Sequence, residues 1–384
     1  MVFRYFVINS TQIANHLQPH QLYIDFARGN DNYYLFTIDN RNRVSFQQIE
    51  ENRTKLIDKN IQAYRENTQN MANTIYNKQL TNNYIKRSNQ KAQKILTQLY
   101  HDLITEHLQN SIKSKSHLII SPDGLLNYFP FEALYNDKYF IDKYTINYIS
   151  SGKEFVRQTK IEEKSPKNNM TVFANANFNA LVKGSIFDDE PETKIEQAKL
   201  TPLGDREIKI VQKYYHNPLI FDANQTTIKN LMNMPSSKIV HISTHGKFLE
   251  DTTILNPMRK AILYFAGANL KPNRGAISAL RLSTINLKDT QLVVLSACQS
   301  GLGSIQNAEG VVGLPKALLQ AGAKNVLMSL WTVSNVKTAM LMDDFYANIS
   351  KKQGYNIALQ NAKKKMIKNY PHPYYWSAFI LSGL

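Results

Sequence analysis

Two residues that can perform nucleophilic and acid–base chemistry each follow a short apolar run. His245 ends the run KIVHISTH, and Cys298, the single cysteine among 384 residues, ends the run QLVVLSAC. A thiol with the ordinary pKa of about 8.5 is mostly protonated at neutral pH. A neighbouring imidazole can take that proton and later deliver it to a leaving amine. We therefore predict a His/Cys dyad that cleaves peptide bonds, provided that the two runs are neighbouring strands.

The glycine after the histidine adds a second element of such a site. Gly246 lets a substrate approach the backbone closely, and the N–H groups of Gly246 and Cys298 are predicted to form an oxyanion hole. Each residue alone has a plainer explanation, because a cysteine after an apolar strand is usually a small core residue. The His-Gly and Ala-Cys pairs, roughly 50 residues apart, together favour catalysis.

A second histidine precedes the first in the string HISTH. This spacing resembles the zinc motif H-E-x-x-H, but the glutamate is absent and the context is a strand rather than a helix. His241 and His245 lie on the same face of a strand. We expect His241 to have a structural role or to support the site from behind it, and we predict neither a metal nor a cofactor.

The composition is that of a folded globular protein, with 43% hydrophobic and 20% charged residues. One cysteine excludes an intrachain disulfide framework. The first residues, MVFRYFVINSTQ, do not resemble a secretory signal, and no apolar run approaches the roughly 20 residues of a membrane span. We expect a soluble cytoplasmic protein that does not bind membranes.

Two regions are expected on either side of a charged, proline-containing linker, KIEEKSPKNNM at 160–170. Residues 1–165 contain a predicted hairpin around GNDN, a long helical stretch from about residue 50 to 110, and two later strands. In residues 166–384, short apolar strands alternate with helices. This order predicts an α/β fold with a mainly parallel sheet flanked by helices, whose sites form at the carboxyl ends of the strands.

The formal net charge of +16 is unevenly distributed. Residues 351–384 contain six lysines and no acidic residue, and most of the lysines lie in ALQNAKKKMIKN, a predicted helix. A nucleic-acid-binding patch and a solvated helix face both explain this pattern. We favour the solvated face, because aromatic residues are scarce among the lysines and no nucleic-acid-binding motif is present.

Several strings together resemble one known family. HISTHG, VVLSACQSGLG, EGVVGLPKALLQAGAKNVLMSLWTVSN and HPYYWSAFILSG are similar to motifs of the CHAT domain, a caspase-like cysteine peptidase domain related to caspases and separases. The resemblance implies a three-layer caspase-like sandwich, with an inactive caspase-like unit in residues 1–165 and a catalytic domain in 166–384. It also implies that His245 and Cys298 are the dyad and that no cofactor takes part.

Two departures from related patterns concern specificity. Ser296-Ala297-Cys298 stands where caspases have Q-A-C, so a pocket for aspartate is not expected. Asn335 stands where the family commonly has aspartate, which weakens a preference for lysine or arginine at the cleavage point. Asn335, Trp331 and Glu309 are candidates for the specificity pocket, although for Glu309 we favour the role of a helix N-terminal carboxylate that the helix dipole stabilises. We expect the acidic loop FDDEPE at 187–192 to be a solvated, mobile segment, with a gate or a processing site as the alternative.

The resulting hypothesis is a cysteine endopeptidase that acts on a protein substrate after activation by a partner or signal. The resemblance implies a role in bacterial defence or programmed cell death. Because family members often carry tetratricopeptide repeats, the activating or sensing partner is expected to be a protein that contains such repeats. The alternative is a non-catalytic interaction module that retains the caspase-like scaffold, and a primary role in nucleic-acid binding ranks last.

Overall fold

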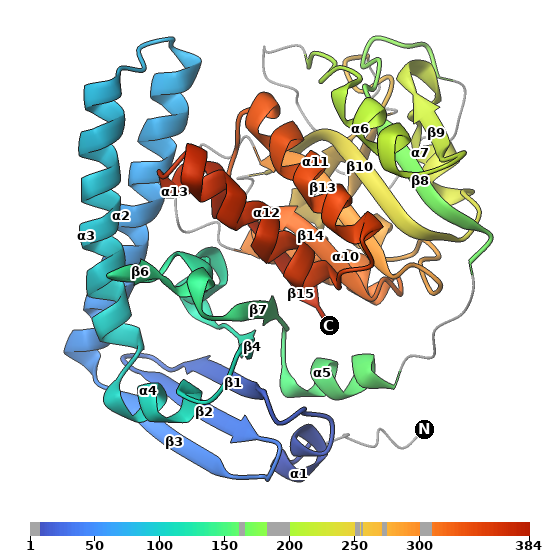
Figure 1. The fold of residues 1–384 in the computed structure, drawn as a ribbon. Coiled ribbons are helices and arrows are strands. Elements are labelled where there is room, and N and C mark those ends of the chain that lie inside the picture. Colours follow the sequence, from blue (N-terminus) through green and yellow to red (C-terminus); the bar gives the residue numbers. More distant parts are fainter. Residues whose placement is uncertain are drawn as a thin grey trace. The chain divides into compact units, whose positions relative to one another are not determined.

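The computed structural model describes residues 8–160, 166–182, 200–249, 254, 256–270, 275–299 and 309–384. The side chains of residues 257, 298, 299 and 309–312 lie outside this description. The chain forms two compact units, one of Met1–Glu162 with Leu381–Leu384 and one of Glu163–Ile380 (Figure 1). Within the described residues, no helix combines the length and the apolar character that crossing a membrane requires.

The first unit contains a mixed sheet. Its strands are β1 (Gln21–Arg28), β2 (Tyr33–Asp39), β3 (Val44–Ile49), β4 (His117–Ser121) and β7 (Thr145–Tyr148). Strands β7, β4 and β1 run parallel, and β1, β2 and β3 form an antiparallel meander. The hairpin predicted around GNDN is therefore confirmed. The end of β15 (Phe379–Gly383) adds to β7 in parallel, with Ser382 opposite Tyr148.

Helices cover this sheet and extend from it. They are α1 (Ser10–Ala14), α2 (Glu51–Tyr76), α3 (Asn82–Leu103), α4 (Glu106–Ile112) and α5 (Gly152–Thr159). Three 3-10 turns (Gly124–Tyr128, Phe131–Ala133, Phe140–Asp142) and the short pair β5 (Tyr135–Asn136) and β6 (Lys138–Tyr139) complete the unit. The predicted helical stretch divides where Thr81 and Thr105 cap new helices with their side chains. Figure 1 shows α2 and α3 side by side as a long helical hairpin.

The second unit contains the larger parallel array. The strands β9 (Leu219–Asp222), β8 (Asn168–Ala174), β10 (Ser237–Phe248), β13 (Leu292–Gln299) and β14 (Asn325–Ser329) pair in that order and in parallel. Beyond the span that β8 pairs with, β10 continues and pairs antiparallel with β11 (Ala261–Tyr264), which pairs with β12 (Ala276–Ser278). Since β8 begins at Asn168, the last three residues of the predicted linker 160–170 belong to a strand, and the predicted end of the linker at residue 170 is wrong.

Two groups of helices accompany this array. One consists of α6 (Arg206–Tyr214), α11 (Asn335–Ser350), α12 (Tyr355–Asn369) and α13 (Pro373–Trp376). The other consists of α8 (Pro257–Lys260), α9 (Ala279–Leu282) and α10 (Glu309–Gln320), and α7 (Ile228–Met232) lies between β9 and β10 in the sequence. Figure 1 shows α6, α11 and α12 in front of β10 and β13. The predicted mainly parallel sheet flanked by helices is thus confirmed.

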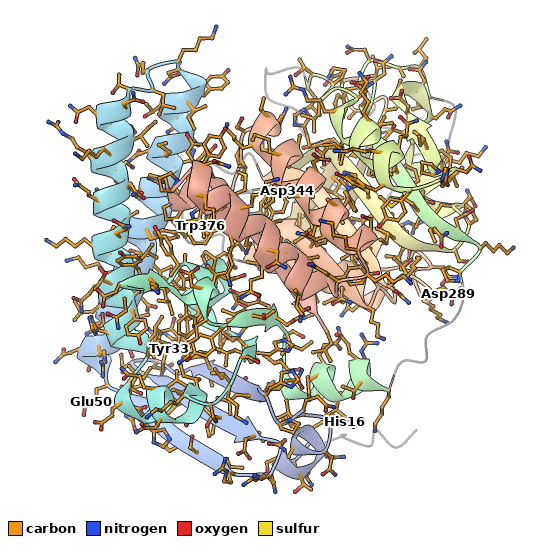
Figure 2. All side chains as sticks on the ribbon, in the orientation of Figure 1. His16, Tyr33, Glu50, Asp289, Asp344 and Trp376 are labelled. Atoms are coloured by element: carbon orange, nitrogen blue, oxygen red, sulfur yellow. The ribbon has the colours of Figure 1, made fainter. Side chains whose placement is uncertain are left out.

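Each unit has its own core. Tyr33 in the first unit and Trp376 in the second, both labelled in Figure 2, are fully buried. In the second unit, β13 begins with the continuous apolar run Leu292–Leu295, which is buried throughout. A strand covered by helices on both faces has this composition, so polar residues at the strand's carboxyl end mark the point where the chain reaches the edge of the core.

Candidate active site

The backbone register brings the two predicted catalytic residues to the same level of the sheet. Strands β10 and β13 run parallel, and His245 on β10 pairs with Cys298 on β13. Two residues earlier, Ser243 pairs with Ser296. Neighbouring strands in a sheet lie about 4.8 Å apart. The two apolar runs are therefore adjacent strands, as the dyad requires, while the side chain of Cys298 lies outside the described part of the chain.

The His245 ring is held by a backbone carbonyl. Its Nε2 lies 2.8 Å from the carbonyl oxygen of Thr201, and the ring of Phe178 tilts against it with centroids 5.3 Å apart. Because a carbonyl oxygen only accepts, this bond requires the proton on Nε2, which makes Nδ1 the accepting nitrogen of the neutral imidazole. Burial lowers the pKa of His245, and the bond to Thr201 opposes that shift. Nδ1 is thus prepared as a base at neutral pH.

Gly246 lies within β10 where neighbouring strands approach on both sides. It pairs with Leu263 on β11 and with Gln299 on β13. A Cβ atom at this position would stand 3.3 Å from a Leu263 methyl carbon and 3.8 Å from Cβ of Ala297. Because glycine has no side chain, Leu263 and Ala297 can pack closely against the backbone next to His245. The contribution of the Gly246 and Cys298 N–H groups to an oxyanion hole stays a prediction.

A buried polar network lies behind the strand ends. The side chain of Glu207, on α6, accepts hydrogen bonds from the hydroxyls of Ser243 (2.9 Å) and Ser296 (3.0 Å) through one carboxylate oxygen. Its other oxygen lies 2.8 Å from Nε2 of His241, in an orientation that does not meet hydrogen-bond geometry. Nδ1 of the fully buried His241 lies 2.7 Å from the Tyr346 hydroxyl oxygen, at hydrogen-bond distance.

This network ties the two strands that carry His245 and Cys298 to one helix. Side chains alternate along a strand, so Ser243 lies on the same face as His245, two residues on. Glu207 thereby links β10 and β13 immediately before the paired positions of His245 and Cys298. His241 contacts Tyr346 and Glu207, as its predicted structural or supporting role would require, although its importance for catalysis is untested.

The predicted specificity residues occupy separate places. Trp331 follows β14, is 6% exposed, and donates its indole N–H to the carbonyl oxygen of Tyr374 at 3.2 Å. Asn335 is exposed and begins α11. Glu309 begins α10, but its side chain lies outside the described part of the chain, as does the whole loop 187–192. Their assignment to a specificity pocket or gate stays a prediction.

Three contributors to the site were missed by the sequence reasoning. Thr201 acts through its backbone carbonyl, which leaves no side-chain signature. Phe178 supplies a ring to His245 from the segment after β8. Glu207 had a detectable signal, because His241, Ser243 and His245 form a polar stripe on one face of a buried strand. Such a stripe requires a polar partner on the helix that covers it.

Comparison with solved structures supports the fold. Two crystal structures of the separase–securin complex of Saccharomyces cerevisiae contain a chain that resembles this one with TM-scores of 0.58 and 0.60. The match covers 97% of this chain and 30% of that chain, at 12% sequence identity. At this identity the likeness concerns the fold alone. The chain thus has an α/β fold similar to that of the matched part of the separase chain.

The CHAT domain family matches residues 92–384, and the chain belongs to this family. The resemblance inferred from the motifs is therefore confirmed. Among curated proteins, tetratricopeptide repeat protein 28 of Homo sapiens is 34% identical over 113 residues, which are 28% of this chain. The same protein of Mus musculus is 36% identical over 95 residues. The chain covers 4% of each of these relatives.

Proposed function

We propose that the chain is a cysteine endopeptidase in which Cys298 is the nucleophile and His245 is the base. The observation that carries this proposal is the pairing of His245 with Cys298 on adjacent parallel strands. The bond from Nε2 of His245 to the Thr201 carbonyl supports it, because that bond leaves Nδ1 to accept a proton. The lowered pKa of His245 keeps the ring in its basic form at neutral pH.

The proposed reaction proceeds in two halves. Nδ1 of His245 takes the thiol proton, and the Cys298 thiolate attacks the substrate carbonyl carbon while the N–H groups of Gly246 and Cys298 hold the oxyanion. The imidazolium then protonates the leaving amine, and the C–N bond breaks to leave a thioester. Water, deprotonated by His245, attacks this thioester. The acid product leaves, and the proton returns to the thiolate.

The proposed setting is a cytoplasmic protein that acts on a protein substrate under the control of a protein partner. The curated relatives are named as tetratricopeptide repeat proteins, and the similar solved structures are of a separase–securin complex. Both support a protein partner, and the first supports one that contains repeats. A role in bacterial defence or programmed cell death belongs to the same proposal and follows from the family resemblance.

The proposal is tested by mapping new protein N-termini in a host lysate treated with wild type, with Cys298→Ala, or with His245→Ala. We expect a defined set of cleavage products with wild type and none with either variant. The variants should keep the wild-type melting temperature. Products that appear equally with wild type and both variants would remove the dyad.

The second candidate function is a non-catalytic interaction module, which the short matches to large repeat-containing relatives favour. An electrophilic peptide probe distinguishes the two functions, because it labels an activated thiolate and spares an inert buried thiol. Labelling of Cys298 that requires His245 supports the peptidase. Absence of labelling, with a partner-bound complex that persists in Cys298→Ala, supports the module.

Nucleic-acid binding through the lysine-rich helix has little geometric support. In α12, Lys363 is 1% exposed, and Lys365 forms a 2.6 Å ion pair with Asp344. Two of the helix's lysines are therefore occupied within the second unit. A gel-shift experiment at low salt checks this, since phosphate contacts would give salt-dependent binding.

A further inference from the structure

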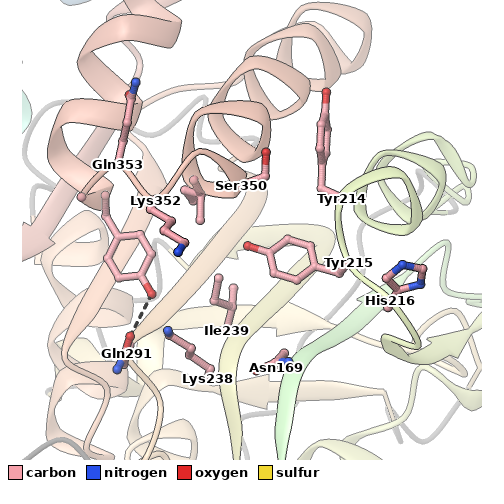
Figure 3. Close-up of a pocket in the computed structure, with 13 residues that line it drawn as sticks. Asn169, Tyr214, Tyr215, His216, Lys238, Ile239, Gln291, Ser350, Lys352 and Gln353 are labelled. Atoms are coloured by element: carbon pink, nitrogen blue, oxygen red, sulfur yellow. Dashed lines mark hydrogen bonds between the residues drawn. The ribbon is translucent and has the colours of Figure 1, made fainter.

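A pocket opens at the opposite end of the parallel array from His245. Its volume is about 630 Å³, and it is lined by residues at the starts of β8 and β10 and by Gln291, just before β13. Lys238 in its wall precedes His245 by seven positions on the same strand, which at roughly 3.3 Å per residue is about 23 Å. Figure 3 shows the lining residues. The pocket is therefore separate from the candidate active site, and its volume lies in the usual range for ligand sites.

The pocket has an excess of positive charge. Lys238 and Lys352 both line it, and Figure 3 shows their side chains directed into the space that the Tyr215 hydroxyl faces. Among the lining residues that the structure describes, none is aspartate or glutamate. Two ammonium groups that share a cavity without a carboxylate repel one another. A bound anion would relieve that repulsion, and lysine is a common ligand of phosphate.

A donor in the same space has no partner. The hydroxyl oxygen of Tyr215 is buried from solvent and makes no hydrogen bond in the structure. Buried polar groups are nearly always paired, so each exception needs an explanation. Burial raises the pKa of Tyr215, which keeps its hydroxyl protonated and able to donate. Because that oxygen is shielded from solvent, a ligand oxygen that satisfies it must first displace a neighbouring side chain.

Helix ends contribute opposing fields. The fifteen-residue helix α12 starts at the pocket, and its N-cap, Gly354, supplies no side-chain cap. Its first N–H groups favour an anion. Helices α6 and α11 end at the same pocket, and their carboxyl ends oppose an anion. Lys352 follows the end of α11 and opposes the field of that carboxyl end, so the case for an anion depends on the two lysines rather than on the helix ends.

The remaining lining favours a planar group. The rings of Tyr215 and Tyr355 and the side chain of Ile239 give flat or apolar surface. Gln291 accepts a hydrogen bond from the Tyr355 hydroxyl at 3.2 Å, which orients its amide. Aromatic rings stack on nucleobases regardless of their identity, and a fixed amide can recognise a base edge.

We propose that this pocket binds a nucleoside phosphate, with its phosphate on Lys238, Lys352 and the Tyr215 hydroxyl and its base against Tyr355. The same chemistry is available from a free nucleotide and from the phosphorylated end of a nucleic acid. Binding involves no covalent step and does not depend on the proposed peptidase activity.

The test uses the whole chain and measures melting temperature and calorimetric affinity. The probes are AMP, GMP, CMP and UMP, with adenosine and inorganic phosphate as partial ligands. We expect at least one nucleotide to bind at least tenfold more tightly than either partial ligand. The variants Lys238→Met and Lys352→Met should each weaken that binding about tenfold or more, and the matched surface variant Lys288→Met should not change it.

Other results would overturn the proposal. They are no binding of any of the four nucleotides at 5 mM, equal binding of phosphate or adenosine, or full binding in the double lysine variant. Tyr215→Phe keeps the ring and provides a second test, because it should weaken nucleotide binding and leave the melting temperature of the empty protein unchanged or higher. A 5′-phosphorylated trinucleotide that binds tenfold more tightly than the mononucleotide would support the site and identify a nucleic-acid end as the source.

Discussion

The two compact units use similar parallel strands but treat the strand ends differently. In the first unit, the end of β7 is closed internally, because the Tyr148 hydroxyl donates to buried Glu132 and accepts from the N–H of Phe131. In the second unit, β10 carries the half-buried imidazole of His245 three residues before the strand ends, and a backbone carbonyl orients this ring. Both units therefore have parallel strands at whose carboxyl-terminal parts a site could form. They differ in that the Tyr148 hydroxyl is fully used in internal hydrogen bonds, whereas Nδ1 of His245 is able to accept a proton.

The largest predicted effect tests whether catalysis belongs to the second unit alone. His245→Ala removes the base, so we expect turnover of a peptide substrate to fall about 10²- to 10⁴-fold. His107→Ala, an exposed histidine of the first unit, should leave turnover unchanged. Steady-state kinetics of both variants at matched folded concentration make the comparison. Equal losses in the two variants would contradict it.

A second prediction concerns acid stability. Burial lowers the pKa of His372, in the second unit, to about 4, and its Nδ1 accepts from the N–H of Tyr374. Below the usual pKa of about 6.5 the unfolded chain binds a proton that the folded chain does not. The free energy of unfolding should therefore fall between pH 6.5 and pH 4, by on the order of 2–3 kcal/mol.

The variant His372→Asn measures how much His372 contributes to the loss of stability in acid. Asparagine can still cap the helix but does not titrate, so the acid-dependent loss measured by urea unfolding should shrink. In the first unit, burial also lowers the pKa of His117, and the same measurement on His117→Asn should show a change of the same sign. An identical pH dependence in wild type and His372→Asn would show that this group does not contribute.

The third prediction compares two carboxylates that accept hydrogen bonds from buried hydroxyls. Glu207→Ala leaves the Ser243 and Ser296 hydroxyls without their acceptor and should cost about 1–3 kcal/mol of stability. Glu132→Ala should cost a similar amount in the first unit, because the Tyr148 hydroxyl loses its acceptor. Only the Glu207 variant should also lower turnover per folded molecule, since only Glu207 ties β10 to β13 before the paired His245 and Cys298.

The two carboxylate variants are measured by chemical denaturation and by kinetics at a temperature where both are folded. Glu207→Gln keeps an acceptor oxygen and should recover most of the stability and the turnover. If Glu207→Ala unfolds easily but retains full turnover per folded molecule, Glu207 has a structural role only.

The smallest effect concerns helix starts. Asn335 begins α11, whose N-cap Ser334 makes no side-chain cap bond and whose first turn has no acidic residue. Asn335→Asp should stabilise the second unit by about 0.3–1 kcal/mol through the helix dipole. The matched change Asn82→Asp, in α3, should have less effect because Thr81 already caps that helix. Thermal unfolding of both variants measures the difference, and a destabilising Asn335→Asp would contradict it.

Much of the fold was predictable because short apolar runs with turn residues between them specify strands directly. The strings around His245 and Cys298 predicted two strands, and the register pairs them as neighbours. The predicted strand ends were too early, because β10 continues to Phe248 and β13 to Gln299. The break between α2 and α3 was not predicted, because the polar stretch has helical composition throughout and the capping role of Thr81 depends on local geometry. For the same reason the start of β8 at Asn168 was taken for linker.

The site was predictable only where the type of a side chain indicates its chemical role. Thr201 contributes a carbonyl oxygen, which every residue possesses, so no residue type signals it. Glu207 lies 36 positions before Ser243, the residue of β10 that it contacts, and the helix that covers this strand is known only after the sheet is assembled. The pocket proposed to bind a nucleotide is lined by residues from several strand starts and helix ends that are far apart in the sequence. No short sequence motif predicts that these segments lie together.

The strand β15 has a consequence for how the protein is made. Its last residues complete the sheet of the first unit, where Ser382 pairs with Tyr148 and the Gly383 carbonyl accepts from the Asn147 amide, 236 positions away. At roughly 5–20 residues per second, a ribosome needs about 10 to 50 s to add that length of chain. During this time the edge of β7 that pairs with β15 has no strand beside it. A nascent first unit therefore exposes an unpaired strand edge, to which a chaperone can bind, until the second unit has been translated.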